Sequence, residues 1–330
     1  MELRHASYNT SLPTVVLVNG GRSVVTEAGN ALLAFFNPDT ATVLRAVSCE
    51  LRDIIGDYPW ENEYNVPVNK VADWRSCFPR AKHAHLEGNL PAKAFVHLRS
   101  LVELHLYSVP FLGRVLAGEY PRLTWLDLDE GIDNDDEEED YTGRRLTDAD
   151  FTALNCPLLT TLSLFGCDGI TGLGGLHCPL LTNIYVLHCE GITDTGLAAL
   201  KCPLLTTLNL SYCESITDIG LAALHYPLLN LHLSHCEGIT DTGLAELKCP
   251  LLTTLNLSEC KSITDAGLAA LHCPLLESLY LRNCISITDT GLAALKCPLL
   301  ATLNILHCEG ITDTGLEALK CPLLVNLNLS

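Results

Sequence analysis

The sequence predicts an α/β solenoid in which a parallel sheet lines the concave side and short helices lie on the convex side. The first observation is a repeated Pro-Leu-Leu, whose prolines stand at positions 157, 179, 203, 227, 250, 274, 298 and 322. The second is an alternation of leucines that ends at a cysteine, and the third is a Thr-Asp pair that opens a short helical pattern. The prolines are 22 to 24 residues apart. A module of that length buries its apolar face only by stacking on its neighbours.

Within one module, the strand comes first and the helix follows. Leu205, Leu208, Leu210 and Cys213 are spaced as L-x-x-L-x-L-x-x-C, and the alternation around the middle leucines predicts a strand with one buried face. Thr217-Asp218 is a favourable start for the helix that follows, and helix capping accounts for the Thr-Asp pairs of all modules. Stacked modules align their strands into a parallel sheet.

The domain organisation follows from where the repeats are regular. We predict a small helical N-terminal cap in residues 1–80 and a solenoid in 81–330. The solenoid has irregular repeats in 81–146, with an acidic loop at 127–140, and regular repeats of about 24 residues in 147–330. We define a rung as one strand with the segment that leads to the next strand. The strand patterns predict about eleven rungs.

Composition and charge exclude several classes of protein. Hydrophobic residues make up 48% of the chain and aromatic residues 6%, so the interior is aliphatic. No apolar run reaches 18 residues and the N-terminus lacks a signal-peptide core, which predicts a soluble protein of the cytoplasm or nucleus. With 20 Lys and Arg against 39 Asp and Glu, the formal charge is −19. Nucleic acid is therefore not an expected partner.

Ten of the acidic residues lie in the run DLDEGIDNDDEEED, residues 127–140. The simplest interpretation is a solvated loop inserted between two rungs. One alternative is an electrostatic contact for a basic partner. The other is a Ca²⁺ site, although the run lacks the ligand order of an EF-hand loop.

The cysteines occupy two columns of the repeat. Seven precede the proline position and seven end the strand pattern, which together account for fourteen of the sixteen. In the six modules that contain both, the two cysteines are eleven residues apart, and no C-x-x-C occurs. We expect reduced, buried thiols. Zinc binding and a disulfide framework are the alternatives. Zinc binding needs clustered ligands and a disulfide framework needs an oxidising compartment, and the sequence indicates neither.

The motif L-x-x-L-x-L-x-x-C, followed by I-T-D-x-G-L and then C-P-x-L, resembles the cysteine-containing leucine-rich repeats of F-box proteins and their relatives. The resemblance covers roughly residues 147–330. It implies a horseshoe-shaped solenoid that binds another protein. The modules here have 24 residues where that subtype usually has 26, so we expect a slightly shorter convex side.

Residues 26–55 differ from the repeat and predict two short amphipathic helices separated by Asn37-Pro38-Asp39. This segment resembles a degenerate F-box without the opening Leu-Pro-Glu and with Leu51 in place of a tryptophan. The resemblance implies docking on a Skp-type adaptor of a cullin ubiquitin ligase. The adaptor contacts it implies are Leu33, Phe36, Val43 and Val47. A cap that shields the first rung is the alternative role, and the two are compatible.

Large amphipathic side chains interrupt the small polar residues that face outward from the predicted sheet. Such side chains dominate the energetics of protein interfaces. The predicted partner-binding residues, in and just beyond the strands, are Tyr185, His188, Tyr212, His232, His235, Tyr280 and His307. The histidines that follow the strands are too far apart to share one metal ion.

No motif in the sequence indicates catalysis, a cofactor or a metal, so we predict a protein that is not an enzyme. The main hypothesis is a protein-interaction scaffold, in the form of an F-box-like substrate-recognition subunit of an SCF-type ubiquitin ligase. The alternative is a structural component of a large assembly such as a flagellum, a ribonucleoprotein or a virion. Because the sequence stops at Ser330, directly after a strand pattern, we expect that end to be covered by a second copy, a partner or a lattice. A longer natural array is the competing explanation.

Overall fold

The computed structural model describes residues 65–67, 71–72, 75, 81–87, 96–107, 113, 116–130 and 145–329. The chain divides into two compact units, Met1–Asn62 with Ala72–Ala81 and Glu63–Val71 with Lys82–Ser330. Almost all described residues belong to the second unit. The F-box-like segment 26–55, with its four predicted adaptor contacts, lies outside the described residues.

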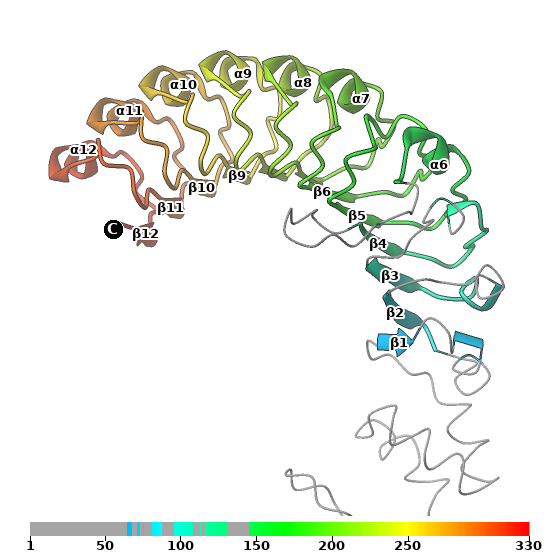
Figure 1. Ribbon diagram of the computed structural model, residues 1–330. Coiled ribbons are helices and arrows are strands. Elements are labelled where there is room, and N and C mark those ends of the chain that lie inside the picture. The colour runs from blue at the N-terminus through cyan, green and yellow to red at the C-terminus, as the bar shows by residue number, and fades with distance from the viewer. Residues whose placement is uncertain are drawn as a thin grey trace, which may run out of the picture. The chain divides into compact units, whose positions relative to one another are not determined.

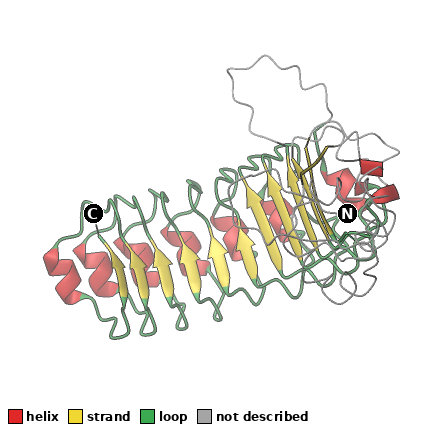
Figure 2. Cartoon of the chain, turned by 90° about the horizontal axis from the view of Figure 1, so that it is seen from below, coloured by secondary structure: helices red, strands yellow, loops and turns green. Residues whose placement is uncertain are grey.

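The second unit is a solenoid whose strands form one parallel sheet, each strand pairing with the next in sequence. Figure 1 shows the strands on the inner side of the arc and the helices on its outer side, and in Figure 2 the strands lie side by side. The predicted fold class is therefore confirmed. The strands are β1 (Asn65–Pro67), β2 (His83–Glu87), β3 (Glu103–Tyr107), β4 (Trp125–Asp129), β5 (Thr161–Phe165), β6 (Asn183–Leu187), β7 (Thr207–Asn209), β8 (Asn230–His232), β9 (Thr254–Asn256), β10 (Ser278–Tyr280), β11 (Thr302–Asn304) and β12 (Asn326–Asn328).

Within the described residues the sheet has twelve strands, one more than the rungs that the sequence predicted. The additional strand is β1, which pairs in parallel with β2. Its three residues, Asn-Val-Pro, are too few to show an alternation of leucines, so the sequence pattern missed it. Strand β1 lies before residue 81, and the predicted division of the chain at that point stays a prediction.

Short helices in the described residues begin where the Thr-Asp pairs predicted them. In α7 to α12, the threonine before the helix accepts a hydrogen bond from a backbone N–H of the first turn. This satisfies one of the donors that a helix start leaves without a partner. The helices are α6 (Asp148–Thr152), α7 (Asp194–Ala198), α8 (Asp218–Ala222), α9 (Asp241–Glu246), α10 (Asp265–Ala270), α11 (Asp289–Ala294) and α12 (Asp313–Ala318).

In six of the seven Thr-Asp pairs, the aspartate has a different role from the one that capping implied. The Asp241 carboxylate accepts two hydrogen bonds from the next rung, from the Thr264 backbone N–H at 2.8 Å and from its hydroxyl at 2.6 Å. Capping therefore explains the threonine, whereas the aspartate joins consecutive rungs. The same pair of bonds links Asp148 to Thr171, Asp194 to Thr217, Asp218 to Thr240, Asp265 to Thr288 and Asp289 to Thr312.

The core consists of the leucine, isoleucine and cysteine columns that the repeat predicted. Leu208 and Leu210 are each 1% exposed, and Cys213 is fully buried. All fourteen described cysteines are free thiols, and only Cys321 is not buried. From Cys213 onward, the strand-ending thiols also donate to a carbonyl of the preceding rung, at 3.0–3.3 Å. These thiols contribute polar contacts between rungs as well as apolar filling.

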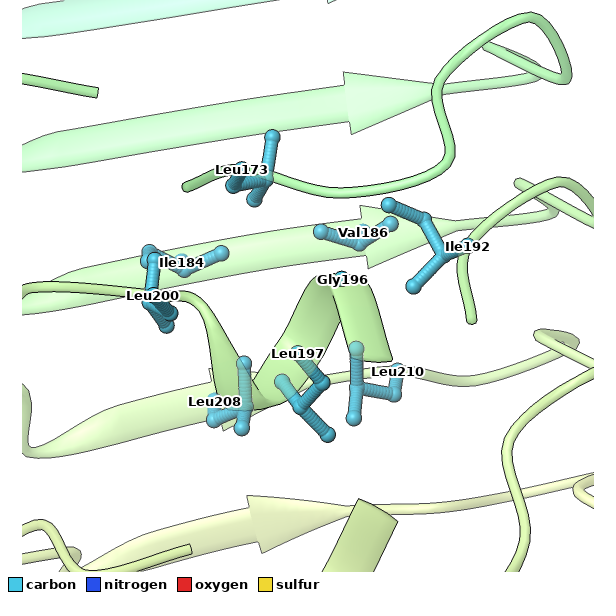
Figure 3. A pocket seen from close by; sticks show the side chains of 9 residues that line it. All are labelled: Leu173, Ile184, Val186, Ile192, Gly196, Leu197, Leu200, Leu208 and Leu210. Atoms are coloured by element: carbon cyan, nitrogen blue, oxygen red, sulfur yellow. The ribbon is translucent and has the colours of Figure 1, made fainter. Parts of the chain in front are cut away.

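The rung of β5 differs from its neighbours because its return segment, residues 171–176, forms no helix. The sequence there is Thr-Gly-Leu-Gly-Gly-Leu, and three glycines disfavour helix. A small apolar cavity lies beside it, under α7 (Figure 3). Its volume is about 10 Å³, and its lining residues are Leu173, Ile184, Val186, Ile192, Gly196, Leu197, Leu200, Leu208 and Leu210.

Part of the acidic run lies in the sheet, which corrects the predicted extent of the loop. Residues 127–129 belong to β4, where Asp127 and Asp129 face outward from the core. Glu130 follows and accepts a hydrogen bond from the Leu146 backbone N–H at 2.6 Å. The run is therefore not a solvated loop from its first residue, and residues 131–140 lie outside the described part. Among the described residues, no helix has the length and apolar character needed to span a bilayer.

Candidate functional site

The outward residues of the strands form straight columns across the concave face. The register aligns Tyr185 of β6 with Asn209 of β7, Asn209 with His232 of β8, and so on to Tyr280 of β10. Tyr185, His232 and Tyr280 therefore occupy alternate strands, with asparagines between them. At about 4.8 Å per strand, successive large side chains are roughly 10 Å apart.

The next three predicted residues come together just beyond the strands. The rings of His188 and Tyr212 stack with centroids 3.9 Å apart, and those of Tyr212 and His235 stack at 4.1 Å. Phe165 tilts against His188 at 5.2 Å. We refer to His188, Tyr212 and His235 as the edge stack. Tyr212, its central ring, is 37% exposed.

The backbone explains why these side chains can stack. His188, Tyr212 and His235 have positive φ angles of 52°, 62° and 60°, which lie in the left-handed region. The chain turns there so that the following cysteine enters the core. Each of the three backbone N–H groups donates to a carbonyl of the next rung. Identical turns one rung apart bring the rings into register.

His307 occupies the same turn position with a φ of 61°, but it does not join the edge stack. Glu259 and Asn283 hold the corresponding positions in the two rungs between His235 and His307. The side-chain amide of Asn283 donates to the Glu259 carboxylate. The structure thus brings together three of the four predicted edge residues.

Burial lowers the pKa of His232 below its ordinary value, because the half-buried ring is desolvated. We therefore expect His232 to be neutral at pH 7, and a neutral imidazole offers a partner both a donor and an acceptor. The concave column then presents aromatic and amide groups without a positive charge at its centre.

A second group of rings, on β2 to β4, was missed by the sequence analysis. His85 and His105 stack at 4.1 Å, and the ring of Trp125 lies 6.0 Å from that of His105. Tyr107 lies 5.9 Å from His85. We refer to His85, His105, Tyr107 and Trp125 as the aromatic panel. Trp125 is 39% exposed on the concave face.

Asp127 joins the panel through hydrogen bonds to one of its carboxylate oxygens. The His105 Nδ1 lies 3.2 Å from this oxygen, and the Tyr107 hydroxyl donates to it at 3.3 Å. Burial acts to raise the pKa of Asp127, but hydrogen bonds from His105, Ser163 and Tyr107 together hold it below its ordinary value. The carboxylate is therefore ionised at pH 7.

The signal for the panel was present in the irregular repeats HAHLEGN, LVELHLYSV and LTWLDLDEG. Their alternation predicted strands, and the same alternation places His85, His105 and Trp125 on the outward face. Their contacts depend on the register, which aligns His85 with His105 and His105 with Asp127. The sequence alone does not set the register between irregular rungs.

Comparison with known families supports the repeat architecture. A family model described as Leucine Rich repeat matches residues 155–176, 201–224, 227–247, 248–271, 272–296 and 296–320. Between residues 155 and 320 the chain therefore carries leucine-rich repeats. No curated protein sequence matches this leucine-rich-repeat chain.

Several solved structures resemble this chain in fold but share little sequence identity with it. The structure of Rad7 and Elc1 from yeast matches with 17% identity and a TM-score of 0.49, covering 85% of this chain and 91% of that one. The Toll–Spatzle complex of Drosophila matches with 15% identity and a TM-score of 0.38, covering 75% and 38%. The plant peptide hormone receptor RGFR1 with RGF2 matches with 14% identity and a TM-score of 0.33, covering 77% and 45%. Likeness at this level carries no information on function.

The leucine-rich-repeat array thus presents two groups of large side chains on one concave sheet. One comprises the alternating column Tyr185, His232 and Tyr280 with the edge stack, and the other is the aromatic panel. Among the described residues, no three His, Cys, Asp or Glu side chains are grouped so that they could hold a metal ion. The chemistry available on this face is stacking, hydrogen bonding and charge pairing.

Proposed function

We propose that this leucine-rich-repeat protein is an interaction scaffold whose protein target binds the concave face, centred on β6 to β10. The observation that carries the proposal is the alternation of Tyr185, His232 and Tyr280 with asparagines in a single column. Small polar residues suffice for the fold at this position, since Ser163 and Asn304 hold it elsewhere. Tyrosine and histidine add contact area that a target can use.

The test replaces the three residues with those that other rungs carry in the same column. The variant Tyr185→Ser, His232→Asn, Tyr280→Ser keeps the strand chemistry and removes the large side chains. We expect affinity for a captured target, measured by surface plasmon resonance, to fall about tenfold or more. The matched control is Glu246→Ala in α9, because other helices carry alanine there. Unchanged affinity of the triple variant would refute the proposed surface.

The edge stack extends this surface beyond the strands. Its rings are held by the turn backbone, so they lose little conformational freedom when a target binds. Tyr212→Asn tests this part separately, since Asn283 occupies the equivalent turn with a φ of 55°. We expect weaker target binding with little change in stability. A large loss of stability would mean that the stack serves the fold.

We further propose that residues 26–55 dock on a Skp-type adaptor, so that the protein acts as a substrate-recognition subunit of an SCF-type ubiquitin ligase. The support is the F-box-like sequence, with Leu33 and Phe36 at helical spacing in the first predicted helix and Val43 and Val47 at helical spacing in the second. Co-expression with the adaptor should yield a complex that survives gel filtration. The variant Phe36→Glu, Val43→Glu should abolish it, whereas the concave triple variant should not. Failure of the intact chain to retain the adaptor would leave a cap as the role of this segment.

A structural role in a large assembly is the second candidate. The Thr, Ser and Asn residues that dominate the concave columns favour it, because a repetitive surface suits repeated neighbours. Sedimentation of a cell extract separates the two functions. A scaffold for recognition should remain in the light fractions, and an assembly component should follow the particle at fixed stoichiometry. In both cases the proposed activity is binding rather than catalysis.

A further inference from the structure

We propose that the aromatic panel is a separate docking site on the concave face, and that it receives an arginine side chain from a basic segment of a partner protein. The proposal rests on the proposed function, because it assigns a partner chemistry to one part of the binding surface. The proposed target site on β6 to β10 does not depend on this arginine site.

The first support is the distribution of charge over the sheet. The nine outward positions of β2 to β4 include four carboxylates, from Glu87, Glu103, Asp127 and Asp129, and no lysine or arginine. The outward positions of strands β5 to β12 contain no carboxylate. The acidity of the concave strands is therefore confined to β2 to β4, around the panel, where it favours a cationic group.

The second support is the position of Trp125. Its partially exposed ring lies opposite Glu103 in the register, and Asp127 follows two residues later on the same face. An arginine guanidinium is planar, stacks on an aromatic ring and pairs with a carboxylate at the same time. The indole with Glu103 beside it offers both interactions to one side chain.

The third support is a buried polar atom in the middle of the panel. His105 is 7% exposed, and its strand lies between those of His85 and Trp125. Its Nδ1 faces Asp127, whereas its Nε2 is buried and has no hydrogen-bond partner in the described part of the chain. A group of this kind destabilises a fold unless something satisfies it. The described part of the sheet therefore leaves this nitrogen unsatisfied at the centre of the panel.

The probe is a fluorescein-labelled peptide of alternating glycine and arginine, measured by fluorescence anisotropy with the full chain at low salt. The control peptide replaces each arginine with citrulline, which keeps the shape and removes the charge. We expect the arginine peptide to bind and the citrulline peptide to bind about fivefold more weakly or worse. Absence of arginine-peptide binding, or equal binding of both peptides, would overturn the proposal.

The decisive variant is Trp125→Ala, because it removes a ring and no charge. Affinity for the arginine peptide should fall about fivefold or more, and Trp125→Phe should restore part of it. Ile219→Ala in α8, where the side chain is 72% exposed, is the matched control and should leave binding within about twofold of the native value. Equal binding by Trp125→Ala would show that the acidic run alone attracts the peptide, and the site would be rejected.

Circular dichroism melts of each variant test whether unfolding causes the loss of binding. Because Trp125 is partly exposed, we expect Trp125→Ala to melt close to the native protein. The triple variant at Tyr185, His232 and Tyr280 tests the proposed function without touching the panel. Loss of target binding in that variant together with unchanged peptide binding by Trp125→Ala would reject the arginine site and leave the scaffold function intact.

Discussion

At the scale of single residues, the Asp-x-Gly sequence at the start of helices α8 to α12 is explained by contacts between rungs. A Cβ atom on Gly267 would collide with the Asp241 carboxylate of the preceding rung. That carboxylate is held in place by its two hydrogen bonds to Thr264. The glycine therefore leaves room for the aspartate of its neighbour, and the same arrangement recurs at Gly220, Gly243, Gly291 and Gly315.

This arrangement predicts that Gly267 and Asp241 are energetically coupled. Gly267→Ala should destabilise the fold by about 1–3 kcal/mol, because the new methyl group displaces the carboxylate. In an Asp241→Ala background, the destabilisation caused by Gly267→Ala should be smaller by at least about 1 kcal/mol. Urea denaturation of the four proteins in this cycle measures the coupling. Equal costs in both backgrounds would contradict the proposed contact.

The Asp-Thr bonds also predict a pH dependence. Hydrogen bonds from the Thr312 hydroxyl, and then from its backbone N–H, lower the pKa of Asp289. A lowered pKa in the folded state stabilises the fold above the ordinary carboxyl pKa of about 3.9, and this contribution is lost as the pH falls through the folded value. Asp289→Asn should therefore melt below the native protein at pH 7, and the difference should vanish near pH 2. A difference that stays constant down to that pH would contradict the assignment.

At the scale of elements, the row of convex helices is interrupted between α6 and α7. The segment 171–176 lies there without a helix, and an open cleft of about 370 Å³ is lined by both helices and by this segment. Figure 1 shows the row continuing from α7 to α12. Helix α7 therefore has a helical neighbour on one side only, whereas α9 has α8 and α10.

This difference predicts that the same substitution at equivalent positions of α7 and α9 destabilises the fold to different extents. Leu197 of α7 lines the small cavity and is 5% exposed, whereas Leu244 of α9 is 1% exposed. Leu244→Ala should lower the free energy of unfolding by about 3–4 kcal/mol, and Leu197→Ala should lower it by about 2 kcal/mol. The loss is smaller at Leu197 because this side chain lines a cavity and makes fewer packing contacts. Chemical denaturation of the two variants compares them directly. A larger cost at Leu197 would show that the interrupted row does not weaken the packing of α7.

At the scale of the whole array, stability comes from contacts between neighbouring rungs, so position in the stack sets local stability. Thr254 of β9 and Asn326 of β12 donate equivalent backbone hydrogen bonds, each 2.9 Å long, to the preceding rung. Their surroundings differ, since Leu255 is fully buried and Leu327 is 36% exposed. The two amides are therefore matched in geometry and differ in the packing around them.

We expect the Asn326 amide to exchange with solvent deuterium faster than the Thr254 amide, because β12 opens without disturbing the interior rungs. Hydrogen exchange followed by mass spectrometry, with peptides from β8 to β12, measures the gradient. Uniform protection from β8 to β12 would mean that the described array opens only as a whole.

Much of this architecture was predictable, because each module repeats the same local signals. The alternation around Leu208 and Leu210 predicted a strand with one buried face, and Thr217-Asp218 predicted the start of α8. The cysteine columns predicted buried thiols, and the structure shows free thiols there. Where a module departs from the pattern, as in β1, the prediction missed the element.

The sequence by itself determined the period, the order of strand and helix, and the side chains that enter the core. These features depend on neighbours within one module, where burial follows the alternation along the chain. The tertiary structure alone decided that His188, Tyr212 and His235 stack, that His105 meets Asp127, and that Asp241 bonds to Thr264. Each of these contacts joins residues 22 to 24 positions apart in the sequence. Strand register and the turn after each strand bring them together, and a shift of one residue would place them on opposite faces.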